Sequence, residues 1–226
     1  MSVSNDLQIF IVRHAESKAN TNGVLDTRAP GGPLTAKGIK QARKLAKTLR
    51  GLNLKREVAA VYSSPFLRTQ KTAEIIAETL GVGLHNVFIN ERVKELYWGD
   101  LNGTASSDLI SKEMTHFLEE VAKGNYLYRL GRSGENQLEL LRRLYEFLSD
   151  VWKKHKGQTI IVVTHSTVAT VIQKIVLHAS GKREKHKSLE NAEFCKIVIS
   201  ESDMRKVNKK KQILDKDFRL YQNDTE

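Results

Sequence analysis

Short apolar runs alternate with longer amphipathic stretches along most of the chain. The runs are rich in β-branched residues, which is typical of buried strands. Buried strands that alternate with helical patterns favour an α/β fold whose sheet is largely parallel. The sequence therefore predicts strands at residues 8–12, 58–62, 87–89, 159–163 and 194–199.

Four of the stretches between or after these runs carry apolar residues at helical spacing. One helix is expected to follow Thr35, which suits an N-cap, and to stop at Gly51. A second is expected to start at Ser64-Pro65, because proline suits the first helical turn, and to end at Gly81. Further helices are predicted within residues 136–155 and 167–178.

Residues 100–133 fit the alternating pattern least well. Residues 108–124 favour a helix, and residues 125–134 favour a loop. We interpret this region as an insertion over the sheet rather than a second domain. The chain is then expected to form one domain over residues 1–200, followed by a basic C-terminal extension over residues 201–226.

The formal net charge of the chain is +11, and part of the excess lies in residues 181–187 and 204–211. A solvated basic tail is favoured over a binding patch. No zinc-ligand spacing or RNA-binding aromatic signature accompanies these clusters, so nucleic acid is not the expected partner, although the basic tail leaves that alternative open. A positive net charge also suits an enzyme that attracts anionic substrates.

The single cysteine, Cys195, cannot form an internal disulfide and lies within a predicted strand, where a structural role is expected. The N-terminus lacks a signal-peptide pattern, and no apolar run approaches the ~20 residues of a membrane span. We therefore expect a cytoplasmic protein without a membrane partner.

Polar residues follow three of the predicted strands at the point where each strand ends. Arg13-His14 follows the first strand, residues 63–65 end the second with Arg68 shortly after, and residues 164–166 follow the fourth. The carboxyl ends of parallel strands share one edge of a sheet, where α/β proteins bind ligands. Two histidines and two arginines that are distant in sequence are therefore predicted to converge.

This combination of side chains suits the transfer of a phosphoryl group. Arginine offers paired donors to phosphate oxygens. A neutral imidazole can attack phosphorus and hold the group as phosphohistidine, while neighbouring cations stabilise the transferring oxygens. The leaving oxygen also needs an acid, and residues 91–103 supply the candidates Glu91, Glu95 and Asp100.

Four motifs in this order resemble those of the histidine phosphatase superfamily, in its phosphoglycerate mutase-like branch. The resemblance covers roughly residues 8–200 and implies a three-layer α/β/α sandwich with a mostly parallel sheet and a helical and loop insertion over the active site. The motifs are VRHAES with Asn20, SSPFLRTQKTA, ELYWGDLNG and VVTHS.

The resemblance implies a role for individual residues. His14 matches the phosphorylated nucleophile, and Glu95 matches the acid and base because it stands four residues before Gly99 in an E-x-x-aromatic-G pattern. Arg13, Arg68 and His165 match the phosphate pocket, with His165 counted among the catalytic residues. The family needs no metal or other cofactor.

The remaining candidates are less directly tied to the motifs. Asn20 is expected to bind substrate beside the pocket, and Ser17 either donates to phosphate or to the backbone. Ser166 stands where relatives often have glycine, so its side chain is expected to narrow the pocket while its backbone N–H stays available. Trp98 occupies a position that is usually Tyr or Phe.

The favoured function is a metal-independent phosphatase that acts on a small phosphorylated metabolite through phosphohistidine. A cofactor-dependent phosphoglycerate mutase is the alternative, but residues 104–133 lack the arginine pair and proline-rich segment of glycolytic mutases. A phosphoprotein- or nucleic-acid-binding module is the non-enzyme alternative. A homodimer is possible, and the physiological substrate is left open.

Overall fold

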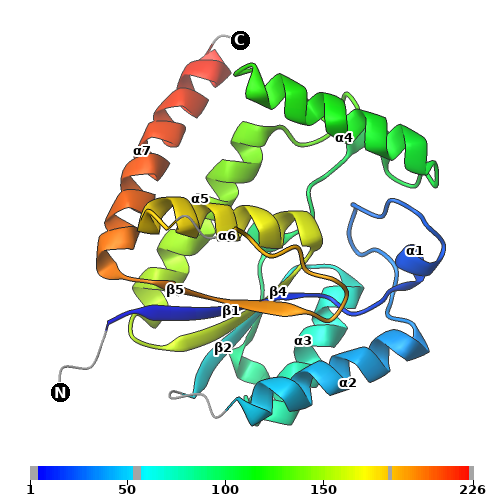
Figure 1. Cartoon of the computed structure of the whole chain (residues 1–226), viewed down its shortest axis with the longest axis vertical. Coiled ribbons are helices and arrows are strands. Elements are labelled where there is room, and N and C mark those ends of the chain that lie inside the picture. The colour runs from blue at the N-terminus through cyan, green and yellow to red at the C-terminus, as the bar shows by residue number, and fades with distance from the viewer. Residues whose placement is uncertain (1–4, 53–56, 183–184, 224–226) are drawn as a thin grey trace.

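The computed structural model describes residues 5–52, 57–182 and 185–223, with side chains described up to residue 216. A five-stranded sheet lies at its centre, in the order β3-β2-β4-β1-β5 (Figure 1). Neighbouring strands pair in parallel except β5, which is antiparallel to β1 at one edge. The strands are β1 (Leu7–Arg13), β2 (Val58–Ser63), β3 (Val87–Ile89), β4 (Thr159–Thr164) and β5 (Phe194–Ile199). All the predicted strands and the mostly parallel sheet are thus confirmed.

Helices cover both faces of this sheet, which confirms the three-layer sandwich (Figure 1). Helices α2 (Ala36–Gly51) and α3 (Leu67–Leu80) cover one face, and α5 (Gln137–His155) and α6 (Ser166–Ser180) cover the other. Successive side chains of a strand point to opposite faces. In β1, Phe10 therefore joins the core with α2 and α3, whereas Ile11 joins the core with α5 and α6.

The helix boundaries follow the capping signals with one exception. The Thr35 side chain caps α2 by accepting a hydrogen bond from the backbone N–H of Gly38, and Gly81 ends α3 with a left-handed φ of 73°. The prediction that Pro65 lies in the first turn of α3 is wrong. Phe66 is the extended N-cap residue of that helix, so Pro65 belongs to the turn that connects β2 to it.

The insertion consists of one helix and a loop, as predicted. Helix α4 spans Ser107–Ala122, and the loop after it returns to α5. This loop packs directly on the segment that carries Glu95: the backbone N–H of Glu135 donates to the carbonyl of Tyr97 at 2.8 Å, and that of Asp100 donates to the carbonyl of Gly131 at 3.1 Å. Gly99 permits this approach, because a Cβ atom there would lie 2.3 Å from the nitrogen of Gly134.

The remaining elements are short, apart from the C-terminal helix. They are α1 (Lys18–Thr21) and the 3-10 turns η1 (Leu84–Asn86), η2 (Glu91–Val93) and η3 (Gly99–Leu101). None of the helices in the described ranges is long and apolar enough to cross a membrane.

The basic C-terminal segment is not a fully solvated tail, contrary to the favoured interpretation. It forms α7 (Glu201–Asn223), which runs beside α5 and α6 (Figure 1). Met204, Val207 and Leu214 are buried in the same core as α5 and α6. Apolar burial therefore holds one side of the helix in place, and the division of the chain at residue 200 stays a prediction.

Candidate active site

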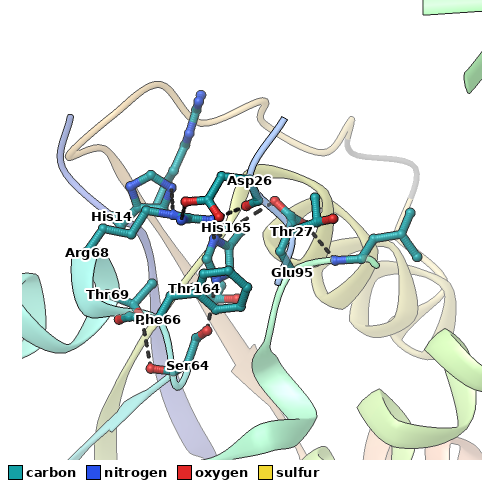
Figure 2. Close-up of polar contacts among 12 residues, drawn as sticks. His14, Asp26, Thr27, Ser64, Phe66, Arg68, Thr69, Glu95, Thr164 and His165 are labelled. Atoms are coloured by element: carbon teal, nitrogen blue, oxygen red, sulfur yellow. Dashed lines mark hydrogen bonds and ion pairs between the residues drawn. The ribbon is translucent and has the colours of Figure 1, made fainter. Parts of the chain in front are cut away.

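The carboxyl ends of β1, β2 and β4 lie side by side, and the predicted site residues project from this edge. Arg13 pairs with Thr164, so His14 and His165 leave adjacent strands at the same level. Their ring centroids are 5.2 Å apart. Arg68, in the first turn of α3, reaches both rings (Figure 2). The structure thus brings together residues that were predicted to converge because they follow the ends of parallel strands.

A cavity of about 160 Å³ opens at this edge of the sheet. Such a volume suits a phosphoryl group with a small leaving group. Six of the predicted site residues line it: Arg13, His14, Asn20, Arg68, Glu95 and Ser166. Ser166 lines it from the first position of α6.

His14 presents a neutral ring nitrogen to its surroundings. Its Nδ1 lies 2.7 Å from the carbonyl oxygen of Ala15, which places the ring proton there, because a carbonyl only accepts. The other nitrogen, Nε2, then carries a lone pair and accepts a hydrogen bond from Nε of Arg68 at 3.2 Å. Burial, and secondarily the Arg68 charge, lowers the pKa of His14 to about 3. The ring is therefore neutral at physiological pH, as a nucleophile requires.

Arg68 is held by Asp26, a residue that belongs to none of the sequence motifs. Nη1 lies 2.6 Å from Oδ2 of Asp26, and Nη2 donates to its backbone carbonyl at 2.7 Å. The guanidinium also lies 4.4 Å from the ring centroid of Phe66. The sequence around Asp26 does not predict this role, because the residue is a single acid in a glycine- and proline-rich loop.

Two glycines shape the loop around this ion pair. The backbone N–H of Gly32 donates to Oδ2 of Asp26 at 2.8 Å. Gly31 has a left-handed φ of 64°, and a Cβ atom there would lie 2.7 Å from Nη1 of Arg68 and 2.8 Å from Oδ2 of Asp26. A side chain at position 31 would therefore have to displace the pair.

We expect Gly31→Ala to lower kcat/KM for any phosphomonoester by at least about tenfold, because moving a positioning group by about 1 Å has effects of up to 10²-fold. Steady-state kinetics and thermal unfolding would measure this. Gly81→Ala is the matched control, since Gly81 has a φ of 73° and nothing within 4 Å of a Cβ atom. If both variants lost the same fraction of kcat/KM, backbone strain alone would explain the effect, and displacement of the ion pair would not be needed.

His165 lies beneath the cavity, fully buried, and is not itself part of the lining. Its Nε2 lies 2.8 Å from Oγ of Ser64, and Nη2 of Arg68 lies 3.4 Å from its Nδ1. Burial and then the neighbouring positive charges hold the pKa of His165 well below its usual value. The ring is therefore neutral in this arrangement and contributes hydrogen bonds rather than a second positive charge.

Glu95 is placed to act as the acid, and the two alternatives are not. Its side chain is 15% exposed and lines the cavity, with Oε2 4.0 Å from Nδ1 of His165. Burial raises the pKa of Glu95, although the hydrogen bond from the Leu96 N–H and the nearby arginines oppose this. Glu91 is exposed beside Lys94, and Asp100 is exposed and bonded to Ser133; neither lines the cavity.

Arg13 and Asn20 line the cavity, but Ser17 does not. Nη1 of Arg13 donates to the carbonyl of Leu189 at 2.8 Å, while its Nε is buried without a partner among the described residues. Ser17 is fully buried as the N-cap of α1, and its hydroxyl donates to Oδ1 of Asn20 at 3.0 Å. Its hydroxyl therefore orients Asn20, and the predicted contact with substrate is not supported by its position.

Two other kinds of site, a metal centre and a cysteine nucleophile, depend on the placement of the His, Cys, Asp and Glu side chains. Within the described ranges, no group of three or more His, Cys, Asp or Glu side chains is arranged to hold a metal ion. Cys195 lies in β5 outside the cavity lining, and burial raises the pKa of its thiol to about 11. At physiological pH it is a protonated, unreactive thiol.

Comparison with known proteins identifies relatives of the whole domain. The model described as histidine phosphatase superfamily (branch 1) matches residues 9–211. The probable phosphoglycerate mutase GpmB of Escherichia fergusonii is 28% identical over 196 residues, which cover 87% of this chain and 86% of that protein. The putative phosphoserine phosphatase 2 of Hydrogenobacter thermophilus is 30% identical over 165 residues, which cover 73% and 76%.

Solved structures share the fold over a similar extent. Bacillus stearothermophilus YhfR has a TM-score of 0.65 and 26% identity, over 84% of this chain and 90% of that one. Phosphoglycerate mutase from Bacillus anthracis has a TM-score of 0.68 and 22% identity, over 92% and 97%. The expected phosphoglycerate mutase-like fold is therefore confirmed.

Proposed function

Because the chain belongs to the histidine phosphatase superfamily and is an enzyme of that family, we propose that it hydrolyses small phosphomonoesters through a phosphohistidine on His14, without a metal. The observation that carries this proposal is the state of His14. The ring is neutral, its Nδ1 is tied to a carbonyl, and its Nε2 faces Arg68 with a lone pair. A nucleophilic nitrogen beside a fixed guanidinium is what attack on phosphorus needs.

The first half-reaction transfers the phosphoryl group to the enzyme. A phosphoryl oxygen that accepts the N–H of Arg68 Nε replaces the bond to His14 and frees the lone pair of Nε2. That nitrogen forms a bond to phosphorus, and the bond from phosphorus to the ester oxygen breaks. Arg68 and Arg13 balance the charge of the phosphoryl oxygens, and His165, whose Nδ1 accepts from Nη2 of Arg68, helps to hold that guanidinium in place.

Glu95 supplies the proton that the departing oxygen needs. Burial raises its pKa, which extends to higher pH the range in which the carboxyl is protonated and can donate to the leaving alkoxide. In the second half-reaction the resulting carboxylate takes a proton from water, whose oxygen attacks phosphorus and releases phosphate from Nε2. Glu95 then regains its acid form, and His14 is free again.

The charges around the cavity favour a phosphatase over a mutase. Among the described lining residues, the cations are Arg13 and Arg68, and the phosphoryl group of the substrate occupies both. A phosphoglycerate mutase must also bind the carboxylate of its substrate, for which no further cation lines this cavity among the described residues. The name of the Escherichia fergusonii relative nevertheless keeps the mutase as the second candidate.

A phosphate-release assay in the presence of a chelator tests the proposal. We expect release from a panel of phosphomonoesters to be unchanged by EDTA, because the nucleophile and the acid are side chains. The same panel, run with 3-phosphoglycerate and 2,3-bisphosphoglycerate, separates the two candidates. Interconversion of phosphoglycerates with little release would establish the mutase, and activity that is lost to EDTA and restored by a metal ion would contradict the mechanism.

The proposal extends to where the enzyme works and what it meets there. Its substrate is a small phosphorylated metabolite, its location is the cytoplasm, and it has no membrane partner. A homodimer, a nucleic-acid partner for the basic segments and a phosphoprotein-binding role remain as alternatives, which sizing and binding experiments on the purified protein would decide.

A further inference from the structure

One acidic side chain of the cavity takes no part in the proposed proton transfers. Asp26 lines the cavity, and its side chain is 16% exposed. Its Oδ2 accepts both side-chain bonds that the residue forms, from the N–H of Gly32 at 2.8 Å and from Nη1 of Arg68 at 2.6 Å. Within the described parts of the chain no hydrogen bond reaches Oδ1. That oxygen is therefore able to accept a hydrogen bond from a group bound in the cavity.

The other residues that line the cavity limit which group of the substrate can supply that hydrogen-bond donor. Arg13 and Arg68 are the described cations of the lining, and a phosphoryl dianion at His14 uses both. The wall beyond them includes the apolar side chains of Val24, Leu25 and Trp98. Apart from Glu95, which gives its proton to the leaving oxygen, Asp26 is the only acidic residue among the described lining residues. An acidic leaving group would be repelled by Asp26, whereas an ammonium or hydroxyl group would be bound.

We propose that Oδ1 of Asp26 binds the leaving group of the substrate by accepting a hydrogen bond from it. The substrate class is then a small phosphomonoester that carries an ammonium or hydroxyl group near the ester oxygen and no carboxylate there. This inference rests on the proposed phosphatase function. It gives Asp26 two separate roles, because Oδ2 positions Arg68 and Oδ1 selects the leaving group.

The variant Asp26→Asn separates these roles. An asparagine can keep its carbonyl oxygen towards Gly32 and Arg68 and place its NH₂ group where Oδ1 stood, which replaces an acceptor by a donor. We would measure kcat/KM of both enzymes for O-phosphoethanolamine, glycerol 3-phosphate, propyl phosphate and 3-phosphoglycerate. The ratio of variant to wild type removes the intrinsic reactivity of each ester and any uniform loss that comes from Arg68.

We expect that ratio to fall at least about tenfold further for O-phosphoethanolamine than for propyl phosphate, because a hydrogen bond between charged groups is lost. Glycerol 3-phosphate should lie between them, and 3-phosphoglycerate should be the least impaired. Asp150→Asn is the matched control, because Asp150 lies on the surface paired with Arg92 and should change none of the four values.

Two results would count against the inference itself. If the ratio of kcat/KM between variant and wild type were the same for all four esters, Asp26 would act only by positioning Arg68. A wild-type enzyme that prefers propyl phosphate to O-phosphoethanolamine would overturn the inference even if the variant failed to fold. Absence of release from every ester tried would instead remove the phosphatase function on which the inference rests, so the two failures are distinguishable.

Discussion

His14→Ala should abolish phosphate release, with kcat reduced by at least about 10³-fold, the scale seen when a nucleophile is removed. The reason is geometric: Nε2 of His14 is the nitrogen that faces Arg68, and alanine leaves no group to accept the phosphoryl transfer. Phosphate-release kinetics would measure the loss. A rapid quench with labelled substrate should trap an acid-labile phosphoryl group on the wild-type protein and none on the variant.

His155→Ala is the matched control for this experiment. His155 is 5% exposed and His14 is 4% exposed, so both substitutions remove a buried imidazole. His155 bonds to the Tyr62 hydroxyl at 2.8 Å and lies outside the cavity lining. It should lower thermal stability while leaving the kcat of the folded fraction intact. Appreciable turnover by His14→Ala, or labelling that survives in it, would contradict the assignment of the nucleophile.

Glu95→Gln should slow phosphoryl transfer in proportion to how badly the leaving group needs a proton. We expect a loss of at least about 10²-fold for alkyl phosphates, the ordinary contribution of a general acid, and a much smaller loss for an activated aryl phosphate. Single-turnover release of the alcohol or phenol would measure this step. Equal losses for both classes of ester would show that Glu95 acts in some way other than as an acid.

The pH dependence of the phosphoryl-transfer rate tests the same role of Glu95 as an acid. Burial raises the pKa of Glu95, so the carboxyl is protonated below that raised value and able to donate. For alkyl phosphates the transfer rate should therefore fall as the pH rises through it, and Glu95→Gln should remove this decline. Glu91→Gln is the control, because Glu91 is exposed outside the cavity and should leave both the rate and the pH profile unchanged.

Much of the fold could be predicted because its signals are local. β1 and β4 are apolar runs that only a doubly covered sheet can bury, and Thr35 and Gly81 mark helix ends by capping groups within a few residues. Pro65 lies just outside the helix that its residue type favours, because Phe66 takes the N-cap position. The packing of the C-terminal helix α7 is hard to predict, because its many lysines obscure the spacing of Met204, Val207 and Leu214.

The candidate site likewise has a part that the sequence predicts and a part that it does not. The sequence by itself determined which residues stand at the ends of β1, β2 and β4, because parallel strands bring their carboxyl ends to one edge and His14, Arg68 and His165 follow those ends closely. Only the tertiary structure decided which atoms face the cavity. It turned Ser17 inwards to cap α1, and it brought Asp26 and Gly31 against Arg68 from a loop without regular structure. Such contacts depend on the path of an irregular backbone, which no periodicity or capping signal in the sequence encodes.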